Sequence, residues 1–272
     1  MRIPLLQIDA FADRPFAGNP AGVCLLTEPR PAAWMQAVAA EMNLSETAFL
    51  VSRGDAEFDL RWFTPTVEIE LCGHATLASA HAIWERSLAR PEQTLRFATA
   101  SGVLRASKMA DGWIEMDFPA NPLAPVVPGS ERWSEALALA SAVGMSVAEA
   151  ASNGRDWILR TGSAAEIRNA HPDFVAVKRL ANMVMVTALA EGRADVDFVS
   201  RCFVPAYGIP EDPVTGSAHC ALGPFWAQRL GRTELTAYQA SARGGTVRVR
   251  VAGDRVALGG QAVTVIVGEL VA

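Results

Sequence analysis

The sequence predicts an α+β protein made of two similar halves, each with short strands around one buried helix. Short β-branched or alternating stretches recur along the chain, which is typical of many short strands. Two helical stretches, residues 73–88 and 216–230, are so apolar that most of their circumference must be buried. Each begins at a glycine, follows an extended run and precedes further strands. We therefore expect an internal structural duplication.

The first half is predicted to run as strands interrupted by two helices. Residues 32–42 have the spacing of an amphipathic helix, and residues 73–88 form the buried one. The expected strands are residues 3–11, 22–26, 47–51, 58–63, 94–98, 103–106 and 113–118. Four prolines in residues 119–128 disfavour both a helix and a central strand, so we place the domain boundary there.

The second half repeats this order after the proline-rich segment. Helices are expected at residues 131–143 and 216–230. Strands are expected at residues 157–160, 183–188, 196–204, 234–239, 245–251, 256–258 and 262–267. The predicted organisation is an N-terminal domain of residues 1–120, a linker of residues 121–128 and a C-terminal domain of residues 129–272.

Composition narrows the function classes. Half of the residues are apolar and 19% are charged, as in soluble globular proteins, and a net charge of -5 gives no reason to expect nucleic acid or an anionic membrane as partner. No segment offers about 20 uninterrupted apolar residues, so a cytoplasmic protein is expected. The four cysteines, Cys24, Cys72, Cys202 and Cys220, lack CxxC spacing and are expected to be thiols.

The two glycine-led helices suggest a site for an acidic ligand. Gly73 and Gly216 each stand at an expected helix start. A helix N-terminus carries unpaired backbone N–H groups and a partial positive charge, so it can hold a carboxylate, an enolate or a phosphate. The pairing predicts that two helix N-termini face one buried acidic substrate.

Glu46 has two interpretations. It follows a turn-like Asn43-Leu44-Ser45 and leads into an apolar strand, so it is either a solvent-facing residue at a strand end or a general acid/base. In the second case, desolvation beside Phe49 and Leu50 would raise the pKa of its carboxyl above the usual value of about 4.3. Such a shift would suit proton transfer near neutral pH.

His74 and Cys72 lie beside the first helix start. His74 is either a core residue or a neutral catalytic imidazole whose pKa the helix N-terminus lowers. A thiol in the position of Cys72 would also have a lowered pKa. Since His74 and His81 are seven residues apart and His219 is remote, no metal site is expected.

The second helix start and one early loop contribute further candidates. Asp212 precedes a proline that enforces an extended backbone, and Thr215 and Ser217 can cap the helix. Asp212 is either a turn residue or a hydrogen-bond acceptor for the substrate or for His74. Asn19 stands in a turn before a strand, and this turn is either plain or lines the site.

Four segments together resemble the phenazine-biosynthesis isomerase-like (PhzF-like) family. They are residues 16–21 (Phe-Ala-Gly-Asn-Pro-Ala), 45–49 (Ser-Glu-Thr-Ala-Phe), 71–76 (Leu-Cys-Gly-His-Ala-Thr) and 212–218 (Asp-Pro-Val-Thr-Gly-Ser-Ala). The resemblance extends to residues 259–263 and so covers nearly the whole chain. It implies a diaminopimelate epimerase-like fold with two similar domains, each a mixed barrel-like sheet wrapped around a central helix. It further implies a site in the cleft between the domains, no cofactor and a homodimer.

The resemblance also assigns roles to residues. Glu46 matches the proton-shuttling carboxylate of the family, and His74, Asp212 and Ser217 match its supporting polar residues. Gly73 and Gly216 match the helix-start glycines. Ser45, Asn19 and Cys72 are expected to contact the substrate. In the phenazine enzyme, a proton shift moves a double bond in a dihydroxyanthranilate-type precursor, whereas the substrate of this chain is not specified by its motifs.

The sequence therefore predicts a cofactor-independent isomerase that moves a proton on a small carboxylate-bearing substrate, with Glu46 as acid/base. The first alternative is an amino- or hydroxy-acid racemase or epimerase that uses Cys72 and Glu46. Aligning Thr215-Gly216 with the second thiol motif of proline racemase places Pro213 where the other thiol should be, which opposes a two-thiol mechanism. The second alternative is a non-catalytic ligand-binding protein. No GxGxxG or Walker motif indicates a nucleotide.

Overall fold

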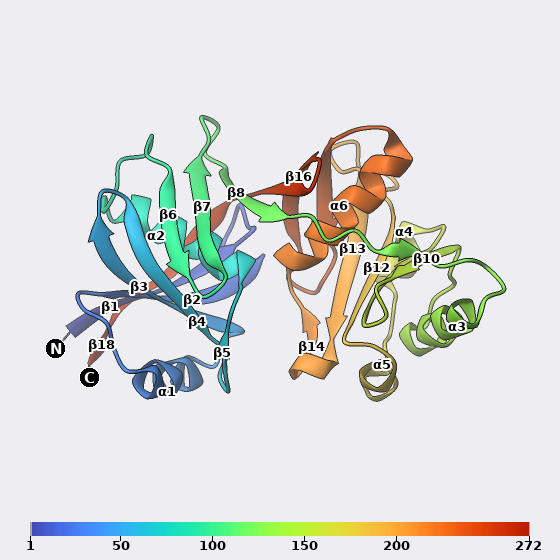
Figure 1. Ribbon diagram of the computed structural model, residues 1–272, viewed down its shortest axis with the longest axis horizontal. Coiled ribbons are helices and arrows are strands. Elements are labelled where there is room, and N and C mark those ends of the chain that lie inside the picture. The colour runs from blue at the N-terminus through green and yellow to red at the C-terminus, as the bar shows by residue number, and fades with distance from the viewer. Residues whose placement is uncertain (1, 272) are drawn as a thin grey trace. The chain divides into compact units, whose positions relative to one another are not determined.

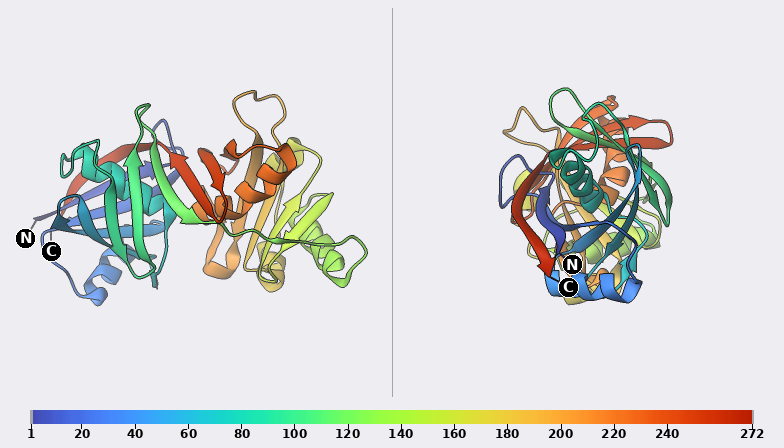
Figure 2. Two further views of the ribbon diagram at one scale, coloured as in Figure 1. Left: turned by 45° about the horizontal axis from the view of Figure 1, so that its top comes forward. Right: turned by 90° about the vertical axis from the view of Figure 1, so that its left-hand side faces the viewer.

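The chain forms two compact units in the computed structural model, which describes residues 2–271 (Figure 1). Unit 1 comprises Met1–Phe118 and Ala257–Ala272, and unit 2 comprises Pro119–Val256. The last strand, β18 (Ala262–Val271), pairs antiparallel with the first, β1 (Arg2–Ala10), as Figures 1 and 2 show. The expected C-terminal domain of residues 129–272 was therefore wrong at its end, because this backbone pairing places the last strand in unit 1.

Unit 1 is a mixed sheet. β1 is antiparallel to β2, β2 is parallel to β3, β3 is antiparallel to β4, β4 is parallel to β6, and β6, β7 and β8 continue antiparallel. A short strand, β5, lies beside β4. These strands are β2 (Asn19–Leu26), β3 (Glu46–Gly54), β4 (Glu57–Phe63), β5 (Glu68–Ile69), β6 (Leu95–Thr99), β7 (Gly102–Lys108) and β8 (Ile114–Pro119).

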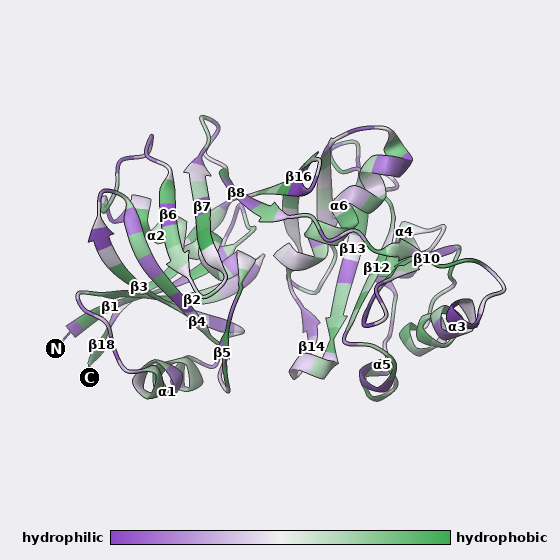
Figure 3. Ribbon diagram, in the orientation of Figure 1, coloured by the Kyte–Doolittle hydropathy of each residue, from purple (hydrophilic) through white to green (hydrophobic). Residues whose placement is uncertain are grey.

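The inner face of the unit 1 strands is apolar, and part of the outer face, around Phe49 and Phe63, is buried in a second cluster with residues of the helix 32–42. In β4, buried Phe58, Leu60 and Trp62 alternate with more exposed polar residues, and this produces the banding of the strand in Figure 3. Alternation with a period of two directs one face of a strand toward the core. On the other face of β4, the side chains of Glu57, Asp59 and Arg61 are partly exposed.

The core of unit 1 is occupied by α2 (Gly73–Glu85), which packs against β1, β2 and β3. Its side chains are buried around the whole circumference from His74 to Ala80, as the sequence predicted. The buried hydroxyls of Thr76 and Ser79 donate to the carbonyls of Cys72 and Ala75, so they need no partner outside the helix. The other helix, α1 (Ala32–Met42), has the predicted bounds and ends at Asn43, which is left-handed.

Unit 2 repeats the strand directions of unit 1. β10 is antiparallel to β11, β11 is parallel to β12, β12 is antiparallel to β13, β13 is parallel to β15, and β15 is antiparallel to β16. β14 lies beside β13 as β5 lies beside β4. The strands are β10 (Glu149–Ser152), β11 (Asp156–Arg160), β12 (Met183–Leu189), β13 (Phe198–Val204), β14 (Ile209–Asp212), β15 (Glu234–Gln239) and β16 (Gly245–Ala252). This repetition confirms the predicted duplication.

The proline-rich segment is part of unit 2 rather than a separate linker. β9 (Ala124–Pro125) lies within residues 121–128 and pairs with β10, and the neighbouring Val126 is buried. Proline is compatible with such a two-residue strand at the end of a set of pairings, because few donors are needed there. The chain returns to unit 1 within β17 (Arg255–Gly260), which pairs with β8.

The central helix of unit 2 is α6 (Gly216–Leu230), which packs against β15 and β16. A Cβ atom at Gly223 would lie 2.6 Å from Val249 Cγ1, so a glycine permits the close approach of this helix to β16. The surrounding helices are α3 (Glu131–Val143), α4 (Ala164–Arg168), α5 (Phe174–Leu180) and the 3-10 turn Pro205–Tyr207. In the described part of the chain, no helix has the length and apolarity needed to cross a membrane.

Candidate active site

Four predicted site residues meet inside unit 1, and we call them the unit 1 cluster: Asn19, Glu46, Cys72 and His74. Asn19 and Glu46 open the neighbouring strands β2 and β3, which are parallel and therefore begin at the same edge of the sheet. Cys72 is the N-terminal cap of α2, and His74 lies in its first turn. All four residues are buried. The starts of β2, β3 and α2 therefore lie close together.

The loop before β2 fixes the position of Asn19. Gly18 has a φ of 64°, and a Cβ atom there would lie 2.1 Å from the carbonyl oxygen of Ala10. Phe16 also has a positive φ, 68°, and its N–H donates to the buried carboxylate of Asp9 at 2.7 Å. Glycine at position 18 is required by both its conformation and the lack of space.

The imidazole of His74 lies between a carboxylate and a thiol. His74 Nε2 is 3.1 Å from Glu46 Oε2, and His74 Nδ1 is 3.5 Å from Cys72 Sγ. The amide Nδ2 of Asn19 donates to Nδ1 at 3.2 Å when the ring is neutral. The Nε2–Oε2 pair is close but lies outside hydrogen-bond geometry, and neither atom has another hydrogen-bond partner within residues 2–271. A small movement of either side chain would complete a hydrogen bond.

The charges in the unit 1 cluster differ from the expectation. Burial lowers the pKa of His74, but the neighbouring Cys72 sulfur and Glu46 carboxylate favour the protonated ring and outweigh burial, so the pKa lies well above its usual value. The pKa of the Cys72 thiol is raised by burial and by Glu46, against the opposing effect of His74. The predictions of a lowered His74 pKa and a lowered Cys72 pKa were both wrong, because nearby side chains and burial exceed the effect of the helix N-terminus.

Glu46, Cys72 and His74 also form a potential set of metal ligands, with one ligand atom of each within 4.8 Å of the others. Sequence spacing did not reveal this group, because Glu46 comes from a different strand. A zinc site places its ligands about 2.0–2.3 Å from the ion, hence roughly 3.5 Å from one another. Here the thiol contacts Nδ1 whereas the carboxylate contacts Nε2, so the ring separates them. The order carboxylate, imidazole, thiol suits proton movement better than metal binding.

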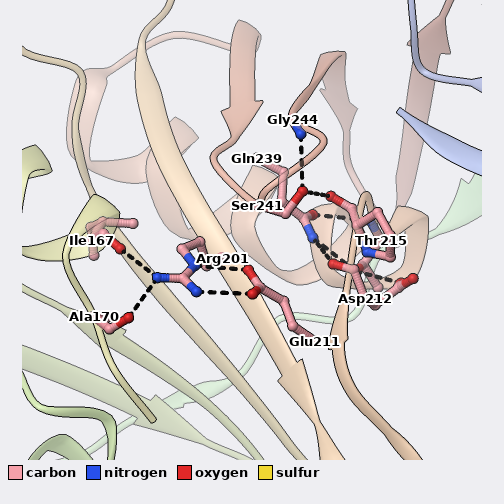
Figure 4. Close-up of polar contacts among 10 residues, drawn as sticks. Ile167, Ala170, Arg201, Glu211, Asp212, Thr215, Gln239, Ser241 and Gly244 are labelled. Atoms are coloured by element: carbon pink, nitrogen blue, oxygen red, sulfur yellow. Dashed lines mark hydrogen bonds and ion pairs between the residues drawn. The ribbon is translucent and has the colours of Figure 1, made fainter. Parts of the chain in front are cut away.

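The predicted residues of unit 2 lie around the start of α6. Asp212 ends β14, Thr215 is the N-terminal cap of α6, and Gly216 is its buried first residue. The Thr215 hydroxyl donates to Asp212 Oδ2 at 2.6 Å (Figure 4). Ser217 lies in the first turn and is exposed. In unit 1, Ser45 is half-buried and directly precedes Glu46.

Gln239 is the residue that sequence reasoning missed in unit 2. Its side chain is fully buried at the end of β15 and accepts from Thr215 N–H at 2.9 Å through Oε1. Its Nε2 donates to the carbonyl of Asp212 at 2.7 Å and to Thr215 Oγ1 at 3.2 Å. No motif marks this residue, since it follows Thr215 by 24 positions. The available signal in the sequence was the position of this glutamine, which ends a strand just before the turn Ser241–Gly244.

Two buried titratable groups near the start of α6, His219 and Cys202, are held neutral. Burial lowers the pKa of His219 to about 4, against a hydrogen bond in which Nδ1–H donates to the Thr215 carbonyl at 2.8 Å. Burial, followed by the charge of Asp212, raises the pKa of the Cys202 thiol. These groups are structural at neutral pH.

Comparison with known proteins shows full-length similarity to one family. The family described as "Phenazine biosynthesis-like protein" (PhzC-PhzF) matches residues 8–268. An uncharacterized isomerase of Halalkalibacterium halodurans is 45% identical, and an uncharacterized isomerase of Pseudomonas aeruginosa is 44% identical, each with 99% of both chains covered.

Solved structures show the same relationship. A phenazine biosynthesis PhzF-family protein of Enterococcus faecalis has a TM-score of 0.90 at 41% identity, with all of both chains covered. A probable proline racemase of Agrobacterium radiobacter has a TM-score of 0.62 at 14% identity, with 99% of this chain and 93% of the other covered, and shares the fold alone. The predicted α+β, epimerase-like fold is thus confirmed.

Proposed function

The chain belongs to the phenazine biosynthesis-like (PhzC-PhzF) family, whose relatives are named isomerases, and we propose that it moves one proton on a small carboxylate-bearing substrate. The product of such a step is an isomer with a shifted double bond. The observation that carries this proposal is the buried contact of 3.1 Å between Glu46 Oε2 and His74 Nε2.

Glu46 is the proposed acid/base. It removes a proton from a carbon that a neighbouring carboxylate or carbonyl activates, and it returns the proton elsewhere on the same molecule. His74, with its raised pKa, places a positive charge beside the carboxylate and orients it. All of these steps use protein side chains.

The start of α2 stabilises the negative charge that develops on the substrate between the two proton transfers. The first N–H groups of α2, from Gly73 onward, have no partner within the helix and point toward its N-terminal end. Asn19 and Ser45 are proposed substrate contacts in unit 1. In unit 2, the N–H groups of Gly216 and Ser217 are the proposed contacts for an acid group, by the same physical argument, and Asp212 is a proposed acceptor of a hydrogen bond from a substrate.

A racemase or epimerase is the second candidate, and the contact of 3.5 Å between Cys72 Sγ and His74 Nδ1 favours it. Here Cys72 and Glu46 would act as two acid/base groups on opposite sides of the imidazole. The raised pKa of the Cys72 thiol opposes this role, since less thiolate is present at neutral pH.

The test is incorporation of solvent deuterium into a panel of small carboxylic acids and into a bacterial cell extract, followed by mass spectrometry. Chromatography of the same samples detects an isomer whose proton returns without exchange. Wild type is compared with Glu46→Gln and with Glu41→Gln, a matched change at an exposed position of α1.

We expect label or a new isomer with wild type and with Glu41→Gln, and neither with Glu46→Gln. Activity that survives in Glu46→Gln would contradict the role of Glu46. Saturable binding of an acid without any change in it would instead favour a non-catalytic binding protein.

A further inference from the structure

Two side chains contact Asp212 at the start of α6: the Thr215 hydroxyl donates to its carboxylate, and the Gln239 amide donates to its carbonyl and to the Thr215 hydroxyl. We propose that Thr215 and Gln239 form a positioning relay that fixes this carboxylate at the start of α6 as a hydrogen-bond acceptor. The relay consists of hydrogen bonds within unit 2 and does not depend on the activity of the protein. Its effect on catalysis rests on the proposed function.

The orientation of the Gln239 amide is determined by its partners. Oε1 must face Thr215, because it accepts from the Thr215 N–H at 2.9 Å. Nε2 then faces Asp212 and Thr215, to whose carbonyl and hydroxyl oxygens it donates (Figure 4). Since the side chain is fully buried, these hydrogen bonds are not replaced by water without cost.

The direction of the next hydrogen bond follows from the first. Thr215 Oγ1 accepts from Gln239 Nε2, so its own hydrogen is free to point at Asp212 Oδ2, at 2.6 Å. Oδ2 is therefore the acceptor of this hydrogen bond. Asp212 acts as a hydrogen-bond acceptor in this arrangement, and Glu46 remains the proposed acid/base.

Gln239 also changes how α6 begins. In a capping box, a Glu or Gln side chain three residues into the helix accepts from the N-cap N–H. Here Gln239 of β15 satisfies the N–H of the cap residue Thr215 from outside the helix. The Thr215 hydroxyl donates to Asp212 Oδ2 and makes no capping hydrogen bond with an N–H group of the first turn.

The strand that ends at Asp212 is anchored on its other side by an ion pair. Arg201 forms two hydrogen bonds with Glu211, the residue before Asp212, at 2.7 and 2.9 Å. The same guanidinium donates to the carbonyls of Ile167 and Ala170 (Figure 4). Asp212 is therefore flanked by two groups of fixed geometry, which favours one position of its carboxylate.

Ser241 provides a matched control within the same network. Its hydroxyl donates to the carbonyl of Pro213 at 2.8 Å and accepts from Gly244 N–H at 3.0 Å. It therefore holds the backbone of the same loop without contacting the Asp212 carboxylate. If only loop stability matters, removing Ser241 should have the same effect as removing Thr215.

The catalytic arm of the test compares Thr215→Val, Thr215→Ser and Ser241→Ala in the deuterium assay, with the carboxylic-acid fraction of bacterial extract as probe. Assays at saturating and limiting amounts of the fraction separate kcat from KM. We expect Thr215→Val to lose about 10-fold or more in kcat, because misplacing a site group is costly. Thr215→Ser and Ser241→Ala should stay within about 3-fold of wild type. Equal losses in Thr215→Val and Ser241→Ala, or no loss in Thr215→Val, would overturn the proposal.

The structural arm needs no substrate. Hydrogen exchange of the Thr215 amide is measured by NMR in wild type, in Gln239→Met, which retains length but lacks the amide, and in Ser241→Ala. We expect faster exchange in Gln239→Met than in Ser241→Ala, with both variants folded by circular dichroism. Unchanged protection in Gln239→Met would overturn the relay. Lost protection together with neither a labelled acid nor a new isomer in wild type would overturn the proposed function and leave the relay standing.

Discussion

Cys72 and Thr215 occupy the same position in the two units, because each is the N-terminal cap of the central helix and directly precedes its first glycine. The Cys72 thiol contacts the imidazole of His74, whereas the Thr215 hydroxyl donates to the Asp212 carboxylate. The duplicated backbone therefore carries two different chemistries. The residue of unit 2 that corresponds to the Cys72 thiol is thus a threonine, and unit 2 has no thiol at this position.

Replacing Glu46 by Gln should reduce kcat at least about 100-fold, or about 3 kcal/mol in barrier, because an amide cannot accept the substrate proton. Substrate binding should change much less, since the amide has nearly the shape of the carboxyl. Initial rates of deuterium incorporation at saturating and limiting substrate measure both effects. A loss confined to KM would assign Glu46 to binding rather than to proton transfer.

Replacing Cys72 by Ala separates the isomerase from the racemase. In the proposed isomerase the thiol only contacts His74, so we expect a loss of less than about 10-fold, much smaller than that of Glu46→Gln. Cys24→Ala, which removes another buried thiol of unit 1, controls for packing. Equal losses in Cys72→Ala and Glu46→Gln, measured by the same deuterium assay, would favour the racemase.

The sequence predicted the central helices and the duplication because their signals are local. Alanine-rich composition after Gly73 and Gly216 indicates burial without knowledge of the surroundings. The place of β18 could not be predicted in this way, since it depends on pairing with β1 about 260 residues earlier, as in the contact of Arg2 with Val271. A helix or strand can be predicted from its own residues, whereas the partner of a strand depends on residues far away in the chain.

The same contrast between local and distant signals applies to the candidate site. Glu46, Cys72 and His74 stand in motifs, and the structure brings them together. The direction of the His74 pKa shift was wrong, because the helix N-terminus was visible in the sequence but the proximity of the Glu46 carboxylate and the Cys72 thiol was not. Gln239 was missed for the same reason, as its partners lie in a segment far from it in the chain.

Replacing Gly18 by Ala should destabilise unit 1 and displace Asn19. A methyl group would lie 2.1 Å from the carbonyl oxygen of Ala10, and the φ of 64° is unfavourable for alanine. We expect a loss of more than about 1 kcal/mol in the free energy of unfolding, measured with urea. Gly54→Ala is the matched control, because Gly54 has a φ of 84° with no atom within 4 Å of an added Cβ. Equal losses in the two variants would show that the backbone conformation, and not the contact with Ala10, sets the cost.

The burial of His219 predicts a specific pH dependence of stability. Its pKa is lowered to about 4 in the folded state, chiefly by burial, against a usual value of 6.5. Above pH 6.5 the ring is neutral in both states, so it has no effect on stability. As the pH falls from 6.5 toward 4, the unfolded chain binds a proton that the folded chain does not, and stability is lost, by on the order of 3 kcal/mol in total.

His219→Asn removes this titration, and the Asn amide can still donate to the Thr215 carbonyl in place of Nδ1–H. Urea unfolding at pH 7, 6, 5 and 4 should therefore show a shallower decline in the variant. Parallel curves for the two proteins would mean that His219 is not held neutral in the folded state.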